Sequence, residues 1–221
     1  MRQTLLNSSR TFVDNFISSS ATKFSIFRTI PSGAPGPSAV PTSTLLILDS
    51  SFNPPSLAHQ TLATSALRAS YSLHTGPRRL LLLFSVHNAD KKAAPAPFEQ
   101  RLALMVKFAE DLHEKMVEIE AHTGQGEPRT SEDLVIDVGL TKLPYYNDKS
   151  VAIEENNDYA GNPMHIHLTG FDTYTRLDLH NSLKWPCKTN SSTGYSQPST
   201  IPITTHHYLL LTASSKSMAY E

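Results

Sequence analysis

The chain has a single cysteine, Cys187, among its 221 residues. One cysteine excludes an internal disulfide framework and a cysteine-rich zinc site. It is typical of a reducing compartment, which we expect to be the cytoplasm or the nucleus. The chain also lacks an excess of charge, because its net charge is −1 and 18% of its residues are charged. No basic surface for general nucleic-acid binding is therefore predicted, and any recognition of phosphate must be local.

Long apolar runs are absent as well. No stretch approaches the roughly 20 apolar residues needed to cross a bilayer, so we expect a soluble protein with neither a membrane nor a nucleic-acid partner. A chain of 221 residues can bury a substantial core, and its length favours one domain, or one domain with a small appendage. The sequence leaves the oligomeric state open.

Acidic residues are nearly missing from the first 40 positions, where Asp14 is the only one. This stretch combines basic residues with many serines, a composition typical of mitochondrial transit peptides. Two patterns favour a packed segment instead. Phe24, Ile26 and Arg28 alternate as in a strand, and the apolar residues before them recur at helical spacing: Leu5, Leu6, Phe12, Val13, Phe16 and Ile17. We expect a leader that packs on the domain, with mitochondrial targeting as the alternative.

Beyond a loop rich in proline, serine and glycine (31–43), apolar strands alternate with amphipathic helices. The predicted strands cover 45–48, 80–86, 134–140 and 165–171, and the predicted helices cover 57–72 and 98–119. A connection rich in Pro, Asn and Asp, around 144–163, separates the last two strands. Such alternation predicts an α/β fold with a doubly wound parallel sheet and right-handed crossovers, a Rossmann-like arrangement.

Polar side chains follow the end of every predicted strand. They are Asp49 to His59; His87, Asn88, Asp90, Lys91 and Lys92; Thr141 and Lys142; and Asp172, Thr173 and Arg176. Ligands of doubly wound sheets bind beyond the carboxyl ends of the strands. We expect a shared cleft there that holds two phosphorylated reactants, although solvated loops would also be polar.

The stretch 44–67 carries the strongest local signal. Its apolar strand ends at Asn53, and Pro54 and Pro55 bias the chain away from helix, so a helix should begin near Ser56 or Leu57. His59 then lies at the positive end of that helix, where unpaired N–H groups and the macrodipole favour an anion. The alternative is an ordinary strand–loop–helix connection with a partly exposed histidine.

SFNPPSLAH (51–59) resembles the GxFxPxHxGH phosphate-binding motif of the nucleotidylyltransferase superfamily. FNPP is similar to its nicotinamide mononucleotide adenylyltransferase branch. Three further segments resemble short fungal members of that family in matching order: NADKKAAPAPFEQRLALM (88–105), TKLPYYNDKS (141–150) and LTGFDTYTR (168–176). The resemblance covers roughly residues 24–178 and implies the nucleotidylyltransferase fold.

The activity that this resemblance implies is adenylyl transfer. The phosphate of nicotinamide mononucleotide would attack the α-phosphorus of ATP, giving NAD and pyrophosphate without a covalent enzyme intermediate. A magnesium ion would accompany ATP, bridging its β- and γ-phosphates. Two alternatives remain: a catalytically impaired nucleotide-binding protein, and a related transferase with another acceptor such as phosphopantetheine.

The resemblance also implies roles for particular residues. His59 would contact the ATP phosphates, and Lys91, with Lys92 beside it, would neutralise nucleotide phosphates; we take His59 and Lys91 as the candidate catalytic residues. The candidate nucleotide-binding residues are Ser51, Phe52, Asn53, Ser56, His59, Asn88, Lys91 and Asp172. Backbone amides of the SFN loop would face phosphate, with Asn53 holding the loop's shape, and Asp172 would accept from a ribose or the nucleotide. Each of these residues also has an alternative without a role in binding: His59 could cap its own helix, Lys91 and Lys92 could be exposed surface residues, and Asp172 could be a helix N-cap.

Three features depart from the family pattern. Ser56 replaces the first motif histidine, so it can donate a hydrogen bond but carries no charge. Ala58 replaces the motif glycine and narrows the approach of backbone to ligand. After about Leu179 no ISSTxxR-like segment follows, and TASSKS is only a faint echo without the arginine. We therefore divide the chain into a leader (1–43), a nucleotidylyltransferase-like domain (44–178) and a low-complexity tail (179–221), which reads as disordered or as an altered or truncated gene product.

Two further observations are left open. Arg101 could reach a phosphate or merely extend its charge from the helix into solvent. His165 and His167 share one strand face and could pair on a metal, but no third ligand is evident, so no metal site is predicted.

Overall fold

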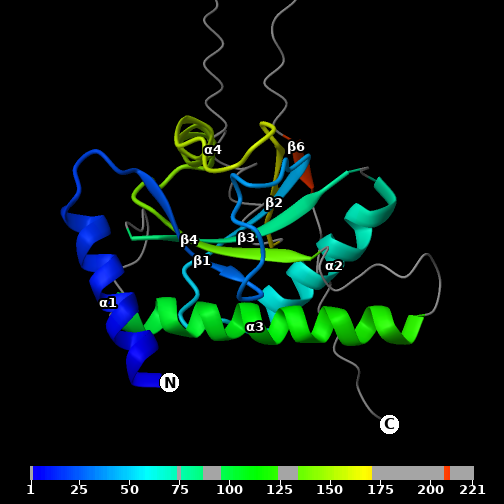
Figure 1. Cartoon of the computed structure of the whole chain (residues 1–221), viewed down its shortest axis with the longest axis horizontal. Coiled ribbons are helices and arrows are strands. Elements are labelled where there is room, and N and C mark those ends of the chain that lie inside the picture. Colours follow the sequence, from blue (N-terminus) through cyan, green and yellow to red (C-terminus); the bar gives the residue numbers. More distant parts are fainter. Residues whose placement is uncertain (1, 74–75, 87–95, 124–133, 171–206, 210–221) are drawn as a thin grey trace, which may run out of the picture.

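A computed structural model of the chain describes residues 2–73, 76–86, 96–123, 134–170 and 207–209. Its centre is a six-stranded sheet in the order β1-β4-β3-β2-β5-β6 (Figure 1). The strands are β1 (Phe24–Ile30), β2 (Thr44–Asp49), β3 (Arg78–Ser85), β4 (Val135–Thr141), β5 (Met164–Leu168) and β6 (His207–Leu209). All neighbouring strands are parallel except β1, which runs antiparallel to β4 at one edge.

The connections of the sheet create one topological switch point. From β2 the chain moves outward through β3 to β4, and it then returns to the other side of β2 to form β5. The next strands along the chain, β3 after β2 and β6 after β5, therefore lie on opposite sides of the β2–β5 pair. Crevices at the carboxyl ends of such strand pairs are the usual ligand sites of open α/β sheets.

Helices cover both faces of the sheet. They are α1 (Arg2–Ser18), α2 (Leu57–Leu73), α3 (Phe98–Thr123) and α4 (Tyr146–Glu155). Helices α1, α2 and α3 pack on the face that carries Leu46 and Leu48, whereas α4 packs on the face that carries Leu45 and Ile47 (Figure 1). Because successive strand residues point to opposite faces, β2 is buried on both sides. The predicted doubly wound α/β fold is confirmed.

The N-terminal segment forms the helix and the strand that its apolar pattern predicts. Val13 and Phe16 of α1 are buried in the main core, and the helix lies against α3.

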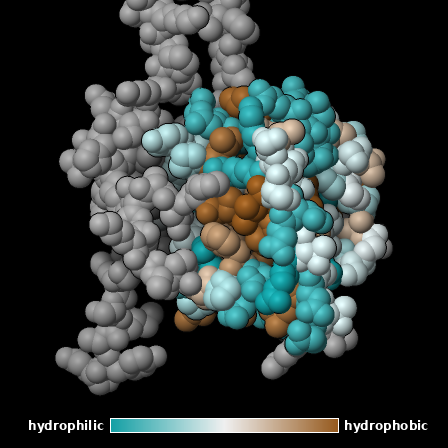
Figure 2. Space-filling view, turned by 90° about the vertical axis from the view of Figure 1, so that its left-hand side faces the viewer, coloured by the Kyte–Doolittle hydropathy of each residue, from teal (hydrophilic) through white to brown (hydrophobic). Residues whose placement is uncertain are grey.

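Figure 2 shows the side of the molecule that lies at the left in Figure 1. On this side the surface has a hydrophobic patch surrounded by hydrophilic residues. No helix among the described residues has the length and apolar character needed to span a membrane.

One prediction is wrong: the connection expected around 144–163 contains the ten-residue helix α4. Its buried residues are Lys149, Ser150, Ala152 and Ile153, so half of its inward face is polar. Hydrophobic periodicity therefore could not reveal this helix. Within the segment predicted as a tail, the described residues 207–209 form β6, which pairs with β5.

A buried polar network ties the loop before β2 to the sheet. Asp137 of β4 is fully buried and accepts from Arg79 Nε at 2.8 Å, Thr29 Oγ1 at 2.7 Å and the Tyr159 hydroxyl at 3.1 Å. Arg79 also donates to the carbonyl of Pro35 at 3.2 Å. Burial, with the Asp137 charge, raises the pKa of Tyr159, so the phenol stays protonated and donates. Because its polar groups pair with one another, this cluster is structural.

Candidate functional site

The connection from β2 to α2 is shaped by one buried aromatic residue. Phe52 is fully buried among core residues, although its φ of +41° lies in the left-handed region that non-glycine residues avoid. Its ring lies 4.8 Å from the His59 ring, centroid to centroid. Burial of the phenyl group offsets a backbone cost on the order of 1 kcal/mol, and it orients the residues on either side of Phe52.

Contacts with the region before α3 hold the rest of this loop. Asn53 Oδ1 accepts from the backbone N–H of Ala96 at 3.3 Å, and the N–H of Ser50 donates to the Leu83 carbonyl of β3 at 3.1 Å. The Asn53 side chain thus ties the loop to the segment that precedes α3.

Arg101 of α3 contacts the same loop. Its guanidinium donates through Nε, at 3.0 Å, and through Nη2 to the carbonyl of Ser51. The side chain is 1% exposed, and its guanidinium carbon lies 4.1 Å from the ring centroid of Phe84 and 5.4 Å from that of Phe98. Within the described part of the chain, no carboxylate lies within ion-pair distance of it. Arg101 therefore does not extend into solvent, and it places a positive charge without a carboxylate partner beside the loop.

His59 lies in the first turn of α2, as the prolines before it predict. Its Nδ1 accepts from the backbone N–H of Ser56 at 3.1 Å and lies 2.8 Å from Ser56 Oγ. The carbonyl of Ser56 accepts from the N–H of Gln60, so Ser56 is the N-cap residue and His59 caps its helix as the acidic residue of a capping box does. His59 therefore does cap its own helix, as the alternative interpretation of this residue expects.

The second ring nitrogen of His59 faces the end of β2. Nε2 lies 2.8 Å from the hydroxyl of Ser50. Because a backbone N–H can only donate, Nδ1 must be the acceptor, and the neutral ring then carries its proton on Nε2. Burial lowers the pKa of His59 below its ordinary value of 6.5, which favours this neutral form. The imidazole therefore donates to Ser50.

A second group of residues approaches the end of β2 from the opposite face of the sheet. Lys149 of α4 donates to the carboxylate of Asp49, and the two side chains are 5% and 7% exposed. Lys149 Nζ also lies 5.3 Å from the ring centroid of Tyr146, whose ring meets that of His167 edge-on at 5.2 Å. Burial raises the pKa of Asp49 above its ordinary value of 3.8, against the opposing effect of the Lys149 ammonium. Residues of α4 thus reach the switch point between β2 and β5.

Sequence reasoning missed Lys149, Tyr146 and Ser150. All three lie in the segment TKLPYYNDKS, so the signal was present as a motif resemblance, but no role followed from it. The hydroxyl of Ser150 lies 2.8 Å from His167 Nε2, which engages that nitrogen with α4. The described residues contain no cluster of three or more His, Cys, Asp or Glu that could hold a metal ion.

The candidate residues divide into two sets. Five of them lie together in the connection between β2 and α2: Ser51, Phe52, Asn53, Ser56 and His59. The others, Asn88, Lys91 and Asp172, lie outside the described residues, as do His87, Asp90, Lys92, Thr173 and Arg176.

The third polar cluster, Thr141 and Lys142, contacts the segment that leads into β1. Thr141 Oγ1 donates to the carbonyl of Lys23 at 3.2 Å, and Lys142 Nζ donates to the carbonyl of Ser19. Both side chains therefore contact the N-terminal segment, and the shared cleft stays a prediction, because two of the four clusters lie outside the described residues.

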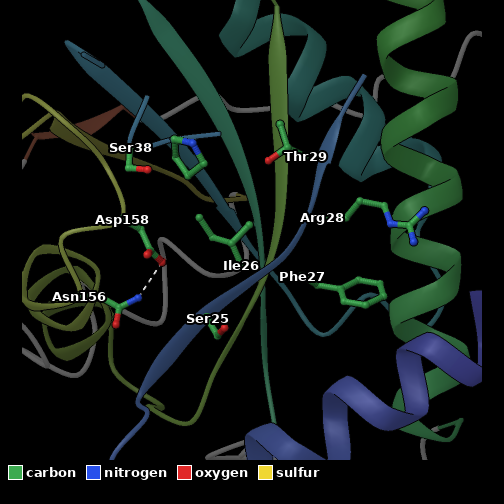
Figure 3. A pocket seen from close by; sticks show the side chains of 9 residues that line it. Ser25, Ile26, Phe27, Arg28, Thr29, Ser38, Asn156 and Asp158 are labelled. Carbon is green, nitrogen blue, oxygen red and sulfur yellow. Dashed lines mark hydrogen bonds between the residues drawn. The ribbon is translucent and has the colours of Figure 1, made fainter. Parts of the chain in front are cut away.

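An open groove of about 380 Å³ lies elsewhere, beside β1 (Figure 3). Its lining consists of residues 25–29, Pro37, Ser38, Asn156 and Asp158. Asn156 Nδ2 donates to Asp158 Oδ2 at 2.6 Å, and burial raises the pKa of Asp158. None of the candidate residues lines this groove, so it is separate from the β2–α2 site.

Comparison with known proteins supports the motif resemblance. No model of a known protein family matches the chain, and no solved structure matches it. The chain is 31% identical over 133 residues to a Schizosaccharomyces pombe protein named "Putative nicotinamide mononucleotide adenylyltransferase". This similarity covers 60% of the chain and 41% of that relative, so the chain spans less than half of the relative's length. The resemblance of this chain to the nicotinamide mononucleotide adenylyltransferase family is thereby confirmed.

Proposed function

We propose that the protein transfers the adenylyl group of ATP to nicotinamide mononucleotide, releasing pyrophosphate and forming NAD. The observation that carries the proposal is the position of His59: it lies in the first turn of α2, where its Nε2 meets the loop that follows β2. That loop lies at the carboxyl end of a strand next to the topological switch point. The name of the S. pombe relative supports the choice of reaction.

The proposed chemistry needs alignment and charge stabilisation more than proton transfer. The attacking phosphate oxygen is already ionised at neutral pH, so the protein must bring it to the α-phosphorus and stabilise negative charge moving to pyrophosphate. The N–H groups at the start of α2 and the buried charge of Arg101 favour an anion beside this loop. Lys91, Asn88 and Asp172 would complete the nucleotide contacts in this proposal.

Magnesium would enter with ATP and balance part of the triphosphate charge. Asp49, the carboxylate next to the loop, already accepts from Lys149. Phosphate oxygens and water would therefore supply most of the ligands of such an ion, as is usual for magnesium in nucleotide complexes.

A coupled assay tests the reaction on the full chain. With ATP, nicotinamide mononucleotide and magnesium, we expect equal amounts of NAD and pyrophosphate. We expect His59→Ala to lower turnover by at least about tenfold, an effect of the size seen when the stabilisation of a developing anion is weakened. Arg68→Ala, an exposed change on the same helix, is the matched control. Unchanged turnover in His59→Ala would remove His59 from the mechanism.

A second candidate function is nucleotide binding without turnover. It is favoured by Ser56, which replaces the first histidine of the motif, and by the contacts of both His59 ring nitrogens with serine hydroxyls. Calorimetry with ATP, combined with the pyrophosphate assay, separates the two functions, because a nucleotide-binding protein without turnover would bind ATP and release no pyrophosphate. Turnover with phosphopantetheine but not with nicotinamide mononucleotide would identify another acceptor instead.

A further inference from the structure

The hydrogen bonds around His59 have a direction. The backbone N–H of Ser56 donates to Nδ1, so the proton of the neutral ring is on Nε2 and is donated to Ser50 Oγ. Ser50 Oγ is thus an acceptor in this contact, and its own hydroxyl proton remains to be donated elsewhere. No other contact of Ser50 Oγ occurs among the described residues. The relay, from Ser56 through His59 to Ser50, ends in a hydroxyl donor.

The backbone places this donor at the edge of the sheet where a ligand would bind. Ser50 directly follows the last residue of β2, and its N–H donates to the Leu83 carbonyl at 3.1 Å, which extends the β2–β3 pairing by one residue. The next residue, Ser51, holds the buried guanidinium of Arg101 through its carbonyl. A partly buried hydroxyl proton near a positive charge that has no carboxylate partner among the described residues suits an anionic acceptor such as a phosphate oxygen.

We propose that Ser50 is the phosphate-contacting residue of this loop and that His59 is a positioning residue acting through it. This inference rests on the proposed nucleotide binding. It differs from a direct contact of His59 with phosphate, because a direct contact requires the bond from Nε2 to Ser50 to break first. No proton is transferred in the proposed arrangement, because Ser50 donates a hydrogen bond to phosphate while it accepts one from the imidazole.

The two arrangements predict opposite effects of removing the Ser50 hydroxyl. If Ser50 contacts phosphate, Ser50→Ala weakens ATP binding. If His59 contacts phosphate directly, the same change removes a competitor for Nε2 and leaves ATP binding unchanged or tighter. Ser50→Thr keeps the hydroxyl and should retain most of the affinity. Ser65→Ala, an exposed serine on α2, is the matched control.

Calorimetric titration of the full chain with ATP and with adenosine tests the proposal. We expect Ser50→Ala to weaken ATP binding about tenfold, the size of one charge-assisted hydrogen bond, and to leave adenosine binding unchanged. A general loss of loop structure would instead weaken both ligands, and melting temperatures report whether each variant folds.

A double-mutant cycle separates the two residues. Because His59 acts through Ser50, the variant Ser50→Ala/His59→Ala should bind ATP no more weakly than the worse single variant. Additive losses, or wild-type affinity in Ser50→Ala, would overturn the relay while leaving the proposed function in place. A wild-type chain that binds no ATP would overturn both.

Discussion

Lys149 of α4 donates a hydrogen bond to the carboxylate of Asp49 at the end of β2, although the two residues lie 100 positions apart. The pair joins a helix on one face of the sheet to the strand that leads into the His59 loop on the other face. Both side chains are almost completely removed from solvent. The end of β2, from which the loop begins, is therefore fixed by a buried ion pair.

Removing one member of this pair should be strongly destabilising. Lys149→Met leaves the Asp49 carboxylate buried without its partner, so we expect the free energy of unfolding in urea to fall by about 3–5 kcal/mol. Asp49→Asn/Lys149→Met should recover most of this loss, because it leaves no uncompensated charge. Lys107→Met removes exposed ion pairs and should change stability by less than about 1 kcal/mol. Equal losses in Lys149→Met and Lys107→Met would contradict the buried-pair interpretation.

Arg101 should contribute to both stability and anion binding. Arg101→Ala removes two charged hydrogen bonds to the Ser51 carbonyl and the contact with the Phe84 ring, so we expect a loss of about 2–4 kcal/mol in the free energy of unfolding. Pyrophosphate should raise the melting temperature of the wild type and not that of Arg101→Ala. The exposed Arg68→Ala should stay within about 0.5 kcal/mol of wild type. Retention of the full pyrophosphate effect in Arg101→Ala would show that its charge does not serve the anion site.

The lowered pKa of His59 makes stability depend on pH. Above 6.5 the imidazole is neutral in both the folded and unfolded states, so it contributes no pH dependence there. As the pH falls below 6.5 the unfolded state takes up the proton first, so stability is lost until the pH passes the lower pKa of the folded state. The free energy of unfolding of the wild type should therefore fall relative to that of His59→Gln, by at most about 1.4 kcal/mol per pH unit. Parallel curves for the two proteins would contradict the assignment of a neutral, buried imidazole.

The Asp137 network should show graded losses. Tyr159→Phe removes one of the hydrogen bonds to the carboxylate and should lower the free energy of unfolding by about 1–2 kcal/mol. Asp137→Asn leaves Arg79 buried without its carboxylate and should cost about 3–5 kcal/mol. Neither residue lies in the β2–α2 site, so ATP affinity measured well below the melting temperature should not change. A lower affinity in folded Tyr159→Phe would mean that the network also shapes the site.

Much of the fold could be predicted from apolar patterning. Leu45 to Leu48 form a strand buried on both faces, and the stripe from Phe98 to Ile119 lies in α3, because burial of one face or both imposes the period that a sequence displays. The start of α2 could likewise be predicted from Pro54 and Pro55, since prolines restrict the backbone locally. Helix α4 could not be read in this way, because it buries a lysine and a serine that reach partners on other strands.

The candidate site also has features that the sequence predicts and features that only the tertiary structure shows. By itself the sequence determined that a histidine would stand in the first turn of a helix after a buried strand, because proline restriction and apolar runs act over a few residues. Only the tertiary structure decided what surrounds that histidine: Ser50 at Nε2, Arg101 beneath the loop and Lys149 across the sheet. The partner of a buried polar group depends on strand order and helix packing, which bring together residues 50 or 100 positions apart. No local sequence pattern therefore predicts which partner a buried polar group will have.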